Sequence, residues 1–186
     1  MILLQKPNNM IKLTSLLVCL LFSVSNCKKE NTMDDILSLE KMTYSGSELR
    51  TDGYYYNEYI TGYFTVYFFY MDGTVLYGSS FPIDELSLQE TKYSNGDHFN
   101  YAKTLKYYWG IFNVEGNDLL FERWYPSQQP LKAFIRSGII LNDTTFKITE
   151  YYRMQDGEKT NIESRNEFYH FKAFSPKPDS TNMFIK

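Results

Sequence analysis

The sequence predicts an all-β protein: a single antiparallel up-and-down meander of about eight or nine strands, closing into a barrel or a strongly curled sheet, with one short helix. Three observations predict this class. The chain contains 17 Tyr, 14 Phe and 2 Trp, and aromatic side chains suit the half-buried surface of a sheet. Turn signals recur at hairpin spacing. No helical pattern lies regularly between the apolar runs, which argues against parallel βαβ units.

Eight apolar and aromatic runs of strand length define the expected strands. They are 53–59 (GYYYNEY), 62–71 (GYFTVYFFYM), 74–80 (TVLYGSS), 106–114 (KYYWGIFNV), 118–125 (DLLFERWY), 131–141 (LKAFIRSGIIL), 144–153 (TTFKITEYYR) and 166–174 (NEFYHFKAF). The expected turns are Asp52-Gly53, Asp72-Gly73, Gly116-Asn117, Asn142-Asp143 and Asp156-Gly157. Closure into a barrel is the usual way for such a meander to remove its unpaired edges.

The longest connection, residues 81–105, holds the expected helix. Pro82 suits the first turn of a helix that runs to about Glu90, and Asn95-Gly96-Asp97 indicates a loop. The preceding strand, 62–71, is aromatic on both faces, which does not fit a barrel wall with one solvated side. We therefore expect its second face to be covered by segment 81–105 or to meet a partner. The C-terminal tail is expected along the surface, with Phe184 and Ile185 docking back.

The N-terminus indicates export. The uncharged run from Leu13 to Val24 is too short to span a membrane. It fits the apolar core of a secretory signal, with Lys6 and Lys12 as the positive flank, and Met10 is an alternative start. The sequence Val24-Ser25-Asn26-Cys27 then resembles the lipobox of bacterial lipoproteins. The resemblance implies cleavage before Cys27 and acylation of its thiol. The alternative is an ordinary cleaved signal with a cysteine nearby.

These features divide the chain into three parts: a lipoprotein signal peptide (1–26), a lipid-anchored tether (27–41) and a β-barrel-like domain (42–186). Lys28 follows the cysteine in place of an aspartate, which favours the outer membrane. The tract KKEN is similar to export signals of surface lipoproteins in Bacteroidota. Periplasmic and surface display both stay open. The expected domain resembles lipocalins in topology and size only.

Charge and motifs narrow the function classes. The net charge is −3, and no basic block indicates nucleic acid as a partner. The mature chain has no cysteine besides Cys27 and no Gly-x-Ser-x-Gly. His98 and His170 have no zinc-ligand spacing, and no glycine-rich phosphate loop is present. We therefore expect neither an enzyme nor a cofactor or metal, with an envelope hydrolase built on paired carboxylates as a less favoured alternative.

Charges within aromatic strands mark the candidate ligand site. Alternation in 118–125 places Glu122 with Trp124 on one face and Arg123 on the other. In 144–153, Glu150 shares a face with Phe146 and Ile148, again by alternation. A buried charge requires a partner, and a ligand cavity is one reason to keep it. The candidates are Trp109, Trp124, Arg123, Glu122 and Glu150. The alternative is that these charges reach solvent at strand ends while the aromatic residues fill the core.

Two functions follow from these features. The first is a lipid-anchored envelope module that binds an unknown protein partner. It predicts exposed aromatic residues such as Tyr63, Tyr67 and Phe69, and no cavity. The second is a lipocalin-like carrier of a small apolar or sugar-like ligand, with a cavity near Trp109 or Trp124. Two tripeptides that start at Asp143 and Asp179 resemble the O-glycosylation sequon of Bacteroidota. They mark Thr144 and Ser180 as modification candidates.

Overall fold

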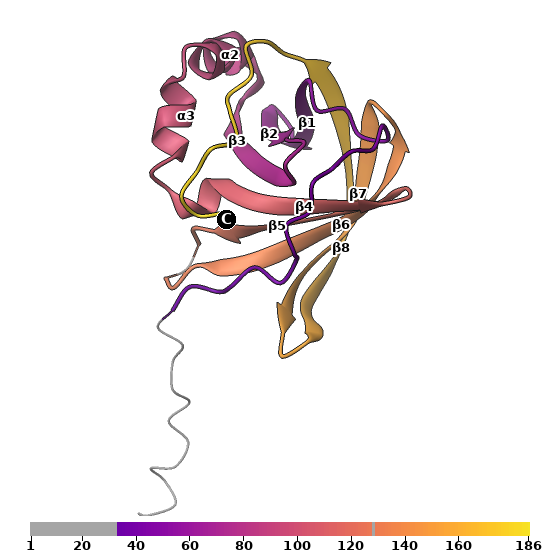
Figure 1. Ribbon diagram of the computed structural model, residues 1–186. Coiled ribbons are helices and arrows are strands. Elements are labelled where there is room, and N and C mark those ends of the chain that lie inside the picture. Colours follow the sequence, from indigo (N-terminus) through magenta and orange to yellow (C-terminus); the bar gives the residue numbers. More distant parts are fainter. Residues whose placement is uncertain (1–32, 128) are drawn as a thin grey trace, which may run out of the picture. The chain divides into compact units, whose positions relative to one another are not determined.

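The computed structural model describes residues 33–127 and 129–186, and residues 33–186 form one compact unit. Eight antiparallel strands form a closed barrel in which each strand pairs with its sequence neighbours and β8 pairs with β1 (Figure 1). This confirms the expected all-β meander and shows that, of the two expected forms, the sheet is a closed barrel and not an open curled sheet. Short helices lie in the connection between β3 and β4, as expected.

The strands are β1 (Gly53–Ile60), β2 (Tyr63–Phe69), β3 (Thr74–Pro82), β4 (Trp109–Glu115), β5 (Asp118–Tyr125), β6 (Lys132–Asn142), β7 (Thr145–Gln155) and β8 (Glu158–Ala173). The helical elements are η1 (Ile83–Glu85), α2 (Leu86–Ser94), α3 (Asp97–Ala102) and η2 (Lys106–Tyr108). The expected helix thus ends at Ser94, and the expected loop after it contains a second helix. Residues 106–108, expected in a strand, form a 3₁₀ turn.

Four of the five expected turns join neighbouring strands. At the β7–β8 turn both Asp156 and Gly157 have positive φ, 53° and 84°, as a tight two-residue hairpin turn requires. The prediction for Asp52-Gly53 is wrong, because Gly53 begins β1. A Cβ at Gly53 would lie 2.1 Å from the carbonyl oxygen of Lys172 on β8. This glycine therefore permits close strand pairing at the seam that closes the barrel.

One end of the barrel interior is packed with aromatic and aliphatic side chains. We call it the filled end; the β2–β3, β4–β5 and β6–β7 turns lie there. Its buried cluster comprises Tyr44, Leu49, Tyr55, Tyr67, Phe69, Val75, Phe112, Leu119, Phe121, Ile140, Phe146, Ile148 and Tyr169. Tyr44 and Leu49 come from the chain before β1, so this segment closes the filled end. The strand residues of the cluster alternate with outward-facing ones, which follows from the two-residue period of a strand.

Helices α2 and α3 cover the outer face of β1 to β4 (Figure 1). Val66 and Phe68 of β2 point outward and pack in a second buried cluster with Tyr93 of α2 and Phe99 of α3. Of the two alternatives expected for the second aromatic face of 62–71, the structure supports cover by segment 81–105. Phe184 and Ile185 pack against the same cluster, so the C-terminal tail docks back as expected.

The chain before β1 covers the outer face of β5 and β6. Glu122 accepts hydrogen bonds from the backbone N–H groups of Ser38 (2.6 Å) and Leu39 (2.8 Å). Asp35 accepts one from Arg153 at 2.8 Å. The described part of the expected tether, residues 33–41, therefore lies along the barrel, and the folded unit includes it. No helical turn forms at Asp34 or Asp35.

Strand β8 begins eight residues earlier than the aromatic run that predicts it. Residues 158–165 pair with β7, for example Lys159 with Met154 and Glu163 with Tyr151. This part of the hairpin projects beyond the other strands at the bottom of Figure 1. Its residues are almost all exposed. Because both faces meet solvent, the sequence carries no apolar alternation there, and pattern reading could not find it.

Candidate functional site

The other end of the barrel holds a cavity of about 540 Å³. We call it the open end; the β1–β2 turn, the β5–β6 loop and the β7–β8 hairpin lie there. A volume of this size lies within the roughly 300–1,000 Å³ range of small-molecule sites. Its lining residues are Tyr59, Thr65, Tyr67, Tyr77, Ser80, Arg123, Tyr125, Pro126, Ser127, Arg136, Arg165, Glu167 and Tyr169.

An aromatic layer separates the cavity from the filled end. The Tyr67 ring lies 5.1 Å from Phe121 and 5.8 Å from Tyr169, centroid to centroid. Tyr67 and Tyr169 line the cavity and also belong to the filled-end cluster. Their rings therefore form the cavity floor. The site is held by the same packing that stabilises the barrel.

A bulge in β3 points two residues that are three positions apart, Tyr77 and Ser80, toward the cavity, although regular alternation would place them on opposite faces. Tyr77 pairs with Tyr67, whereas Ser79 pairs with Val66, so one residue of β3 is extra at this point. Ser79 has φ of 92°, a conformation that non-glycine residues rarely adopt. Because of the bulge, both Tyr77 and Ser80 face inward, and the Tyr77 hydroxyl donates to Ser80 Oγ at 2.9 Å. Bulges commonly re-aim side chains at functional sites.

Arg123 lies in the cavity wall and is only 5% exposed. One terminal nitrogen, Nη1, donates to the carbonyl oxygens of Tyr107 (3.0 Å) and Trp124 (3.1 Å). Its Nε has no hydrogen-bond partner among the described residues. The guanidinium lies over the rings of Tyr125 (3.9 Å) and Tyr77 (4.2 Å). No carboxylate in the described part of the chain forms an ion pair with it.

Arg136 on β6 lines the same cavity. Its guanidinium lies over Tyr151 (5.1 Å) and Tyr125 (5.4 Å). Its Nε also has no hydrogen-bond partner within the described ranges. Glu167 Oε2 lies 3.8 Å from this Nε, which is an ion pair without a hydrogen bond. Glu167 is shared with Arg165, 3.9 Å away.

Two tyrosine hydroxyls that line the cavity, those of Tyr77 and Tyr169, stay protonated at neutral pH. Burial raises the pKa of Tyr77, and it raises that of Tyr151 to about 12. Burial also raises the pKa of Tyr169 well above its ordinary value. These two phenols are therefore neutral hydrogen-bonding groups, and the lining also contains three arginines and one glutamate.

Of the five residues that the sequence marks as ligand candidates, the structure places only Arg123 in the cavity. Trp109 and Trp124 point outward and are buried outside the barrel. The indole Nε1 of Trp109 donates to the Ala102 carbonyl (2.9 Å), and that of Trp124 to the Asp35 carbonyl (2.7 Å). Glu122 also points outward. The predicted alternation along β5 is therefore correct. The face that carries Glu122 and Trp124, however, packs against the chain before β1 and lines no cavity.

Glu150 is likewise outside the cavity, where its carboxylate pairs with Lys159 at 2.8 Å. The prediction that it shares a face with Phe146 and Ile148 is wrong. The register of β7 with β8 shifts between Ile148 and Glu150. A bulge of this kind adds one residue to a strand and reverses the faces beyond it.

Arg136 and the tyrosines of the cavity were missed by sequence reasoning. In 131–141 alternation puts Arg136 in line with Phe134 and Ile140, and Ile140 is in the filled-end cluster. This signal resembles the one that marked Arg123, so Arg136 could have been found. The tyrosines could not, because tyrosines on a strand read as core whether or not a cavity adjoins them.

Neither histidine lines the cavity. His98 is a buried residue of α3, with Nε2 3.3 Å from the Tyr77 carbonyl oxygen and Nδ1 3.3 Å from Gln89 Nε2 of α2. A carbonyl only accepts, so Nε2 carries the proton and Nδ1 accepts from the amide. Burial lowers the pKa of His98, in keeping with this neutral form. His170 is exposed on β8.

The modification candidates lie in turns or in the tail. Thr144 is half-buried in the β6–β7 turn, and its hydroxyl donates to Asn142 Oδ1 at 2.8 Å. The Ser180 hydroxyl donates to Asp72 Oδ2 at 3.0 Å. Cys27, the expected lipidation residue, lies outside the described residues.

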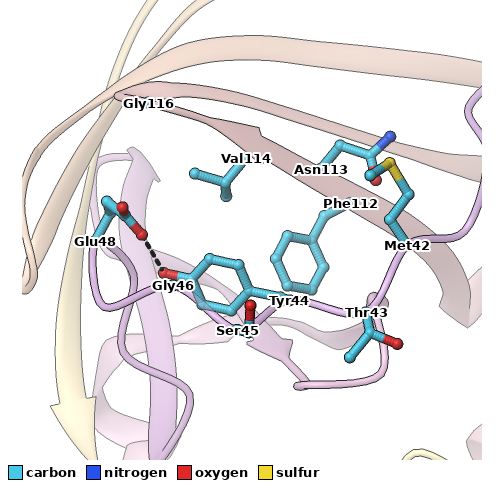
Figure 2. Close-up of a pocket in the computed structure, with 10 residues that line it drawn as sticks. All are labelled: Met42, Thr43, Tyr44, Ser45, Gly46, Glu48, Phe112, Asn113, Val114 and Gly116. Atoms are coloured by element: carbon cyan, nitrogen blue, oxygen red, sulfur yellow. Dashed lines mark hydrogen bonds between the residues drawn. The ribbon is translucent and has the colours of Figure 1, made fainter.

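A second pocket, of about 190 Å³, lies between the chain before β1 and β4 at the filled end (Figure 2). Figure 2 shows the Tyr44 ring pointing toward Phe112, with its hydroxyl hydrogen-bonded to Glu48. That hydroxyl also accepts from the Leu49 N–H at 2.7 Å, so its proton and one of its acceptor positions are already used within the chain. The pocket is smaller than small-molecule sites usually are. The open-end cavity is therefore the stronger candidate.

The exposed aromatic face expected of an interaction module is not formed by the residues named for it. Tyr67 and Phe69 are each 1% exposed inside the barrel, and only Tyr63 reaches solvent, at 43%. Within residues 33–127 and 129–186, no three His, Cys, Asp or Glu side chains gather in a way that could hold a metal ion. No helix in those ranges combines the length and apolar character needed to cross a membrane.

Searches against protein-family models, curated proteins and solved structures found no match to this chain.

Proposed function

We propose that this protein is a lipid-anchored protein of the bacterial cell envelope whose barrel binds a small molecule in the open-end cavity. One observation carries the binding role. A cavity of about 540 Å³ is walled by tyrosines and lined by arginines, of which Arg123 has no carboxylate partner and Arg136 makes no side-chain hydrogen bond among the described residues. Apolar walls with a few placed polar groups are the usual construction of small-molecule sites. The protein acts by binding, without catalysis, as a carrier or sensor of its ligand.

The envelope location depends on the resemblance of Val24-Ser25-Asn26-Cys27 to a lipobox. Two or three acyl chains on Cys27 would hold the protein in a membrane, because one chain alone gives only reversible binding. The outer membrane is the proposed site. A fully extended chain from Cys27 to Asp34 spans at most about 25 Å.

Asp34 is bound near the open end of the barrel. Its carboxylate accepts a hydrogen bond from the Leu131 N–H at 2.9 Å. Leu131 is the last residue of the β5–β6 loop, whose Pro126 and Ser127 line the cavity. A lipid on Cys27 would therefore keep the cavity mouth close to the membrane surface, where amphiphilic molecules concentrate.

Native mass spectrometry tests the binding role. Residues 27–186 with Cys27→Ser are produced in the export pathway of the host and purified without detergent. We expect a small-molecule adduct that is lost on collisional activation. Ser80→Tyr adds a ring inside the cavity and should abolish the adduct. Ser87→Tyr makes the same change at an exposed position on α2 and should keep it.

A bare mass for the unsubstituted protein, or equal adducts in both tyrosine variants, would contradict binding in this cavity. Labelling of the full chain with palmitate tests the anchor in parallel. Cys27→Ser should remove the label and Cys19→Ser should keep it.

A further inference from the structure

Resting on the proposed function, we infer that the ligand is an organic acid with a flat, largely apolar body. Its anionic group is bound between the guanidiniums of Arg123 and Arg136, and its body lies against the tyrosine rings of the cavity.

The charge of the cavity wall is unbalanced. Arg123, Arg136 and Arg165 line it, and Glu167 is the single carboxylate among the lining residues. Arg165 also pairs with Glu163, outside the lining. This leaves Arg123 without a carboxylate partner in the described chain, although it is only 5% exposed. A buried charge is costly unless it is paired, so the wall lacks an anion.

The two guanidiniums converge on the same part of the cavity. On adjacent strands, Arg123 pairs with Phe134 and Arg136 pairs with Phe121, so the two arginines are diagonal neighbours on one face. Such neighbours lie roughly 7–8 Å apart at the backbone. Both guanidiniums lie over the Tyr125 ring, at 3.9 Å and 5.4 Å. Two like charges this close favour an anion between them.

The rings under the guanidiniums leave their donors free for a ligand. A guanidinium stacked on an aromatic face keeps its N–H groups in its own plane, where they match a carboxylate or another oxyanion. The Nε atoms of both arginines are buried without a hydrogen-bond partner in the described chain, so the donors that can reach a ligand are the terminal nitrogens. Nη2 of Arg123 and both Nη atoms of Arg136 make no hydrogen bond there, and they are not buried as the Nε atoms are. Arg136 makes no side-chain hydrogen bond there at all, so its terminal donors are available without breaking a hydrogen bond.

The rest of the lining suits a flat body with few polar groups. Tyr67, Tyr77, Tyr125 and Tyr169 provide ring surfaces. The hydroxyls on the β2–β3 wall already bind one another, since Tyr77 donates to Ser80 and Thr65 lies 2.8 Å from Ser80 Oγ. A neutral sugar would have to compete for these hydroxyls and would leave Arg123 without an anionic partner and Arg136 with only its ion pair to Glu167. An organic acid with an aromatic or alicyclic skeleton fits both parts of the lining, because its anionic group pairs with the arginines and its apolar body packs on the tyrosine rings.

A matched pair of fluorescent dyes tests this inference on residues 27–186 with Cys27→Ser, which contain the whole compact unit. The probes are 1-anilinonaphthalene-8-sulfonate, an anion, and N-phenyl-1-naphthylamine, its uncharged analogue. We expect the anionic dye to bind about tenfold or more tightly than the neutral dye, because only the former forms charge-assisted hydrogen bonds. Inorganic phosphate alone should displace it weakly, since phosphate lacks the apolar body.

Arg123→Met and Arg136→Met should each weaken the anionic dye about tenfold or more and change the neutral dye by less than about threefold. Arg50→Met removes the same charge outside the cavity lining, where Arg50 pairs with Asp52, and should alter neither affinity. Near-ultraviolet circular dichroism of each variant checks that tertiary packing is retained. Arg136→Met carries the test if Arg123→Met unfolds, because Arg136 makes no side-chain hydrogen bond within the described ranges.

Equal binding of the two dyes, with no effect of either cavity arginine, would overturn the organic-acid inference and leave a cavity for neutral ligands. Failure of both dyes to bind would overturn the inference and, together with a bare native mass, the binding role itself. Full displacement of the anionic dye by phosphate at matched concentration would replace the organic acid by a simple oxyanion.

Discussion

At the filled end of the barrel, Phe69 lies between four rings, with centroids 5.0 Å from Phe112, 5.5 Å from Phe121 and 5.8 Å from both Tyr55 and Phe146. At the open end, on the inner face of the same barrel, Arg136 has ring contacts, one ion pair at 3.8 Å and no side-chain hydrogen bond within the described chain. The first arrangement is a close-packed apolar core. The arrangement at the open end keeps the buried charge of Arg136 with only one long ion pair, which costs stability. We therefore attribute this arginine to ligand binding.

A second contrast lies along one strand, between neighbouring residues on opposite faces of β5. Glu122 is 2% exposed, and its carboxylate accepts hydrogen bonds from two backbone N–H groups and the Ser38 hydroxyl. Arg123 is 5% exposed and has no carboxylate partner among the described residues. Glu122 is therefore a structural charge that fixes the chain before β1. Arg123 is a charge that the described chain leaves uncompensated.

The largest expected effect is at the filled end. Phe69→Ala should lower the free energy of unfolding by about 3–5 kcal/mol, because it removes a fully buried ring and leaves a cavity among rigid neighbours. Urea unfolding followed by circular dichroism measures this loss. Phe168→Ala, at a position 40% exposed on β8, is the matched control and should cost less than about 1 kcal/mol. Similar losses in both variants would contradict the division of the interior into two ends.

Glu122→Ala should have an intermediate effect. It leaves the Ser38 and Leu39 N–H groups without their acceptor, and we expect a loss of about 1–3 kcal/mol in the free energy of unfolding. Hydrogen exchange of these two amides should rise at the same time, because the chain before β1 loses its attachment. Unchanged exchange at both amides would show that Glu122 does not fix this segment.

Glu122→Gln is the matched control, since its amide oxygen can still accept from the backbone. Burial raises the pKa of Glu122, so its ionisation costs more in the folded than in the unfolded state. The wild type should therefore lose stability relative to Glu122→Gln as the pH rises from 4.5, the ordinary pKa of glutamate, through the raised pKa of Glu122. A difference that stays constant with pH would contradict the raised pKa.

The smallest expected effect on stability is at the open end. Arg136→Met should leave the free energy of unfolding unchanged or raise it by up to about 1 kcal/mol, because it removes a poorly paired buried charge. Arg153→Met is the control: Arg153 pairs with Asp35 at 2.8 Å, and its loss should cost about 1–3 kcal/mol. If Arg136→Met costs more than Arg153→Met in the same urea titration, Arg136 is structural and the contrast between the two ends fails.

Most of the barrel was predictable because strands with one buried face carry their own pattern. The runs from Tyr63 to Phe69 and from Asp118 to Tyr125 show it, and the Asp72-Gly73 and Asp156-Gly157 turns separate such runs. The pattern broke at bulges, such as the one in β3 between Tyr77 and Ser80, and where both faces of a strand meet solvent. The bulge after Ile148 reversed the face of Glu150. The arm of β8 from Glu158 to Arg165 has two solvated faces and therefore no alternation.

The candidate site was predictable only in part. Alternation showed that Glu122 and Trp124 oppose Arg123, but it could not say which face lies inside the barrel. That choice depends on partners distant in sequence: Ser38 and Leu39 for Glu122, and Asp35 for Trp124. Because residues on both faces of β5 are buried, their hydrophobicity alone could not show which face points into the barrel.

By itself, the sequence determined the fold class, the strand order and most turns, because these follow from local periodicity and from residues that adopt positive φ. It also determined that charges such as Arg123 lie within aromatic strands. Only the tertiary structure decided that the barrel closes and that the chain before β1 covers β5. It also showed that Arg123 and Arg136 meet in one cavity, because closure and burial depend on contacts between distant segments. A side chain's face is a local property, but what that face meets is decided by the whole chain.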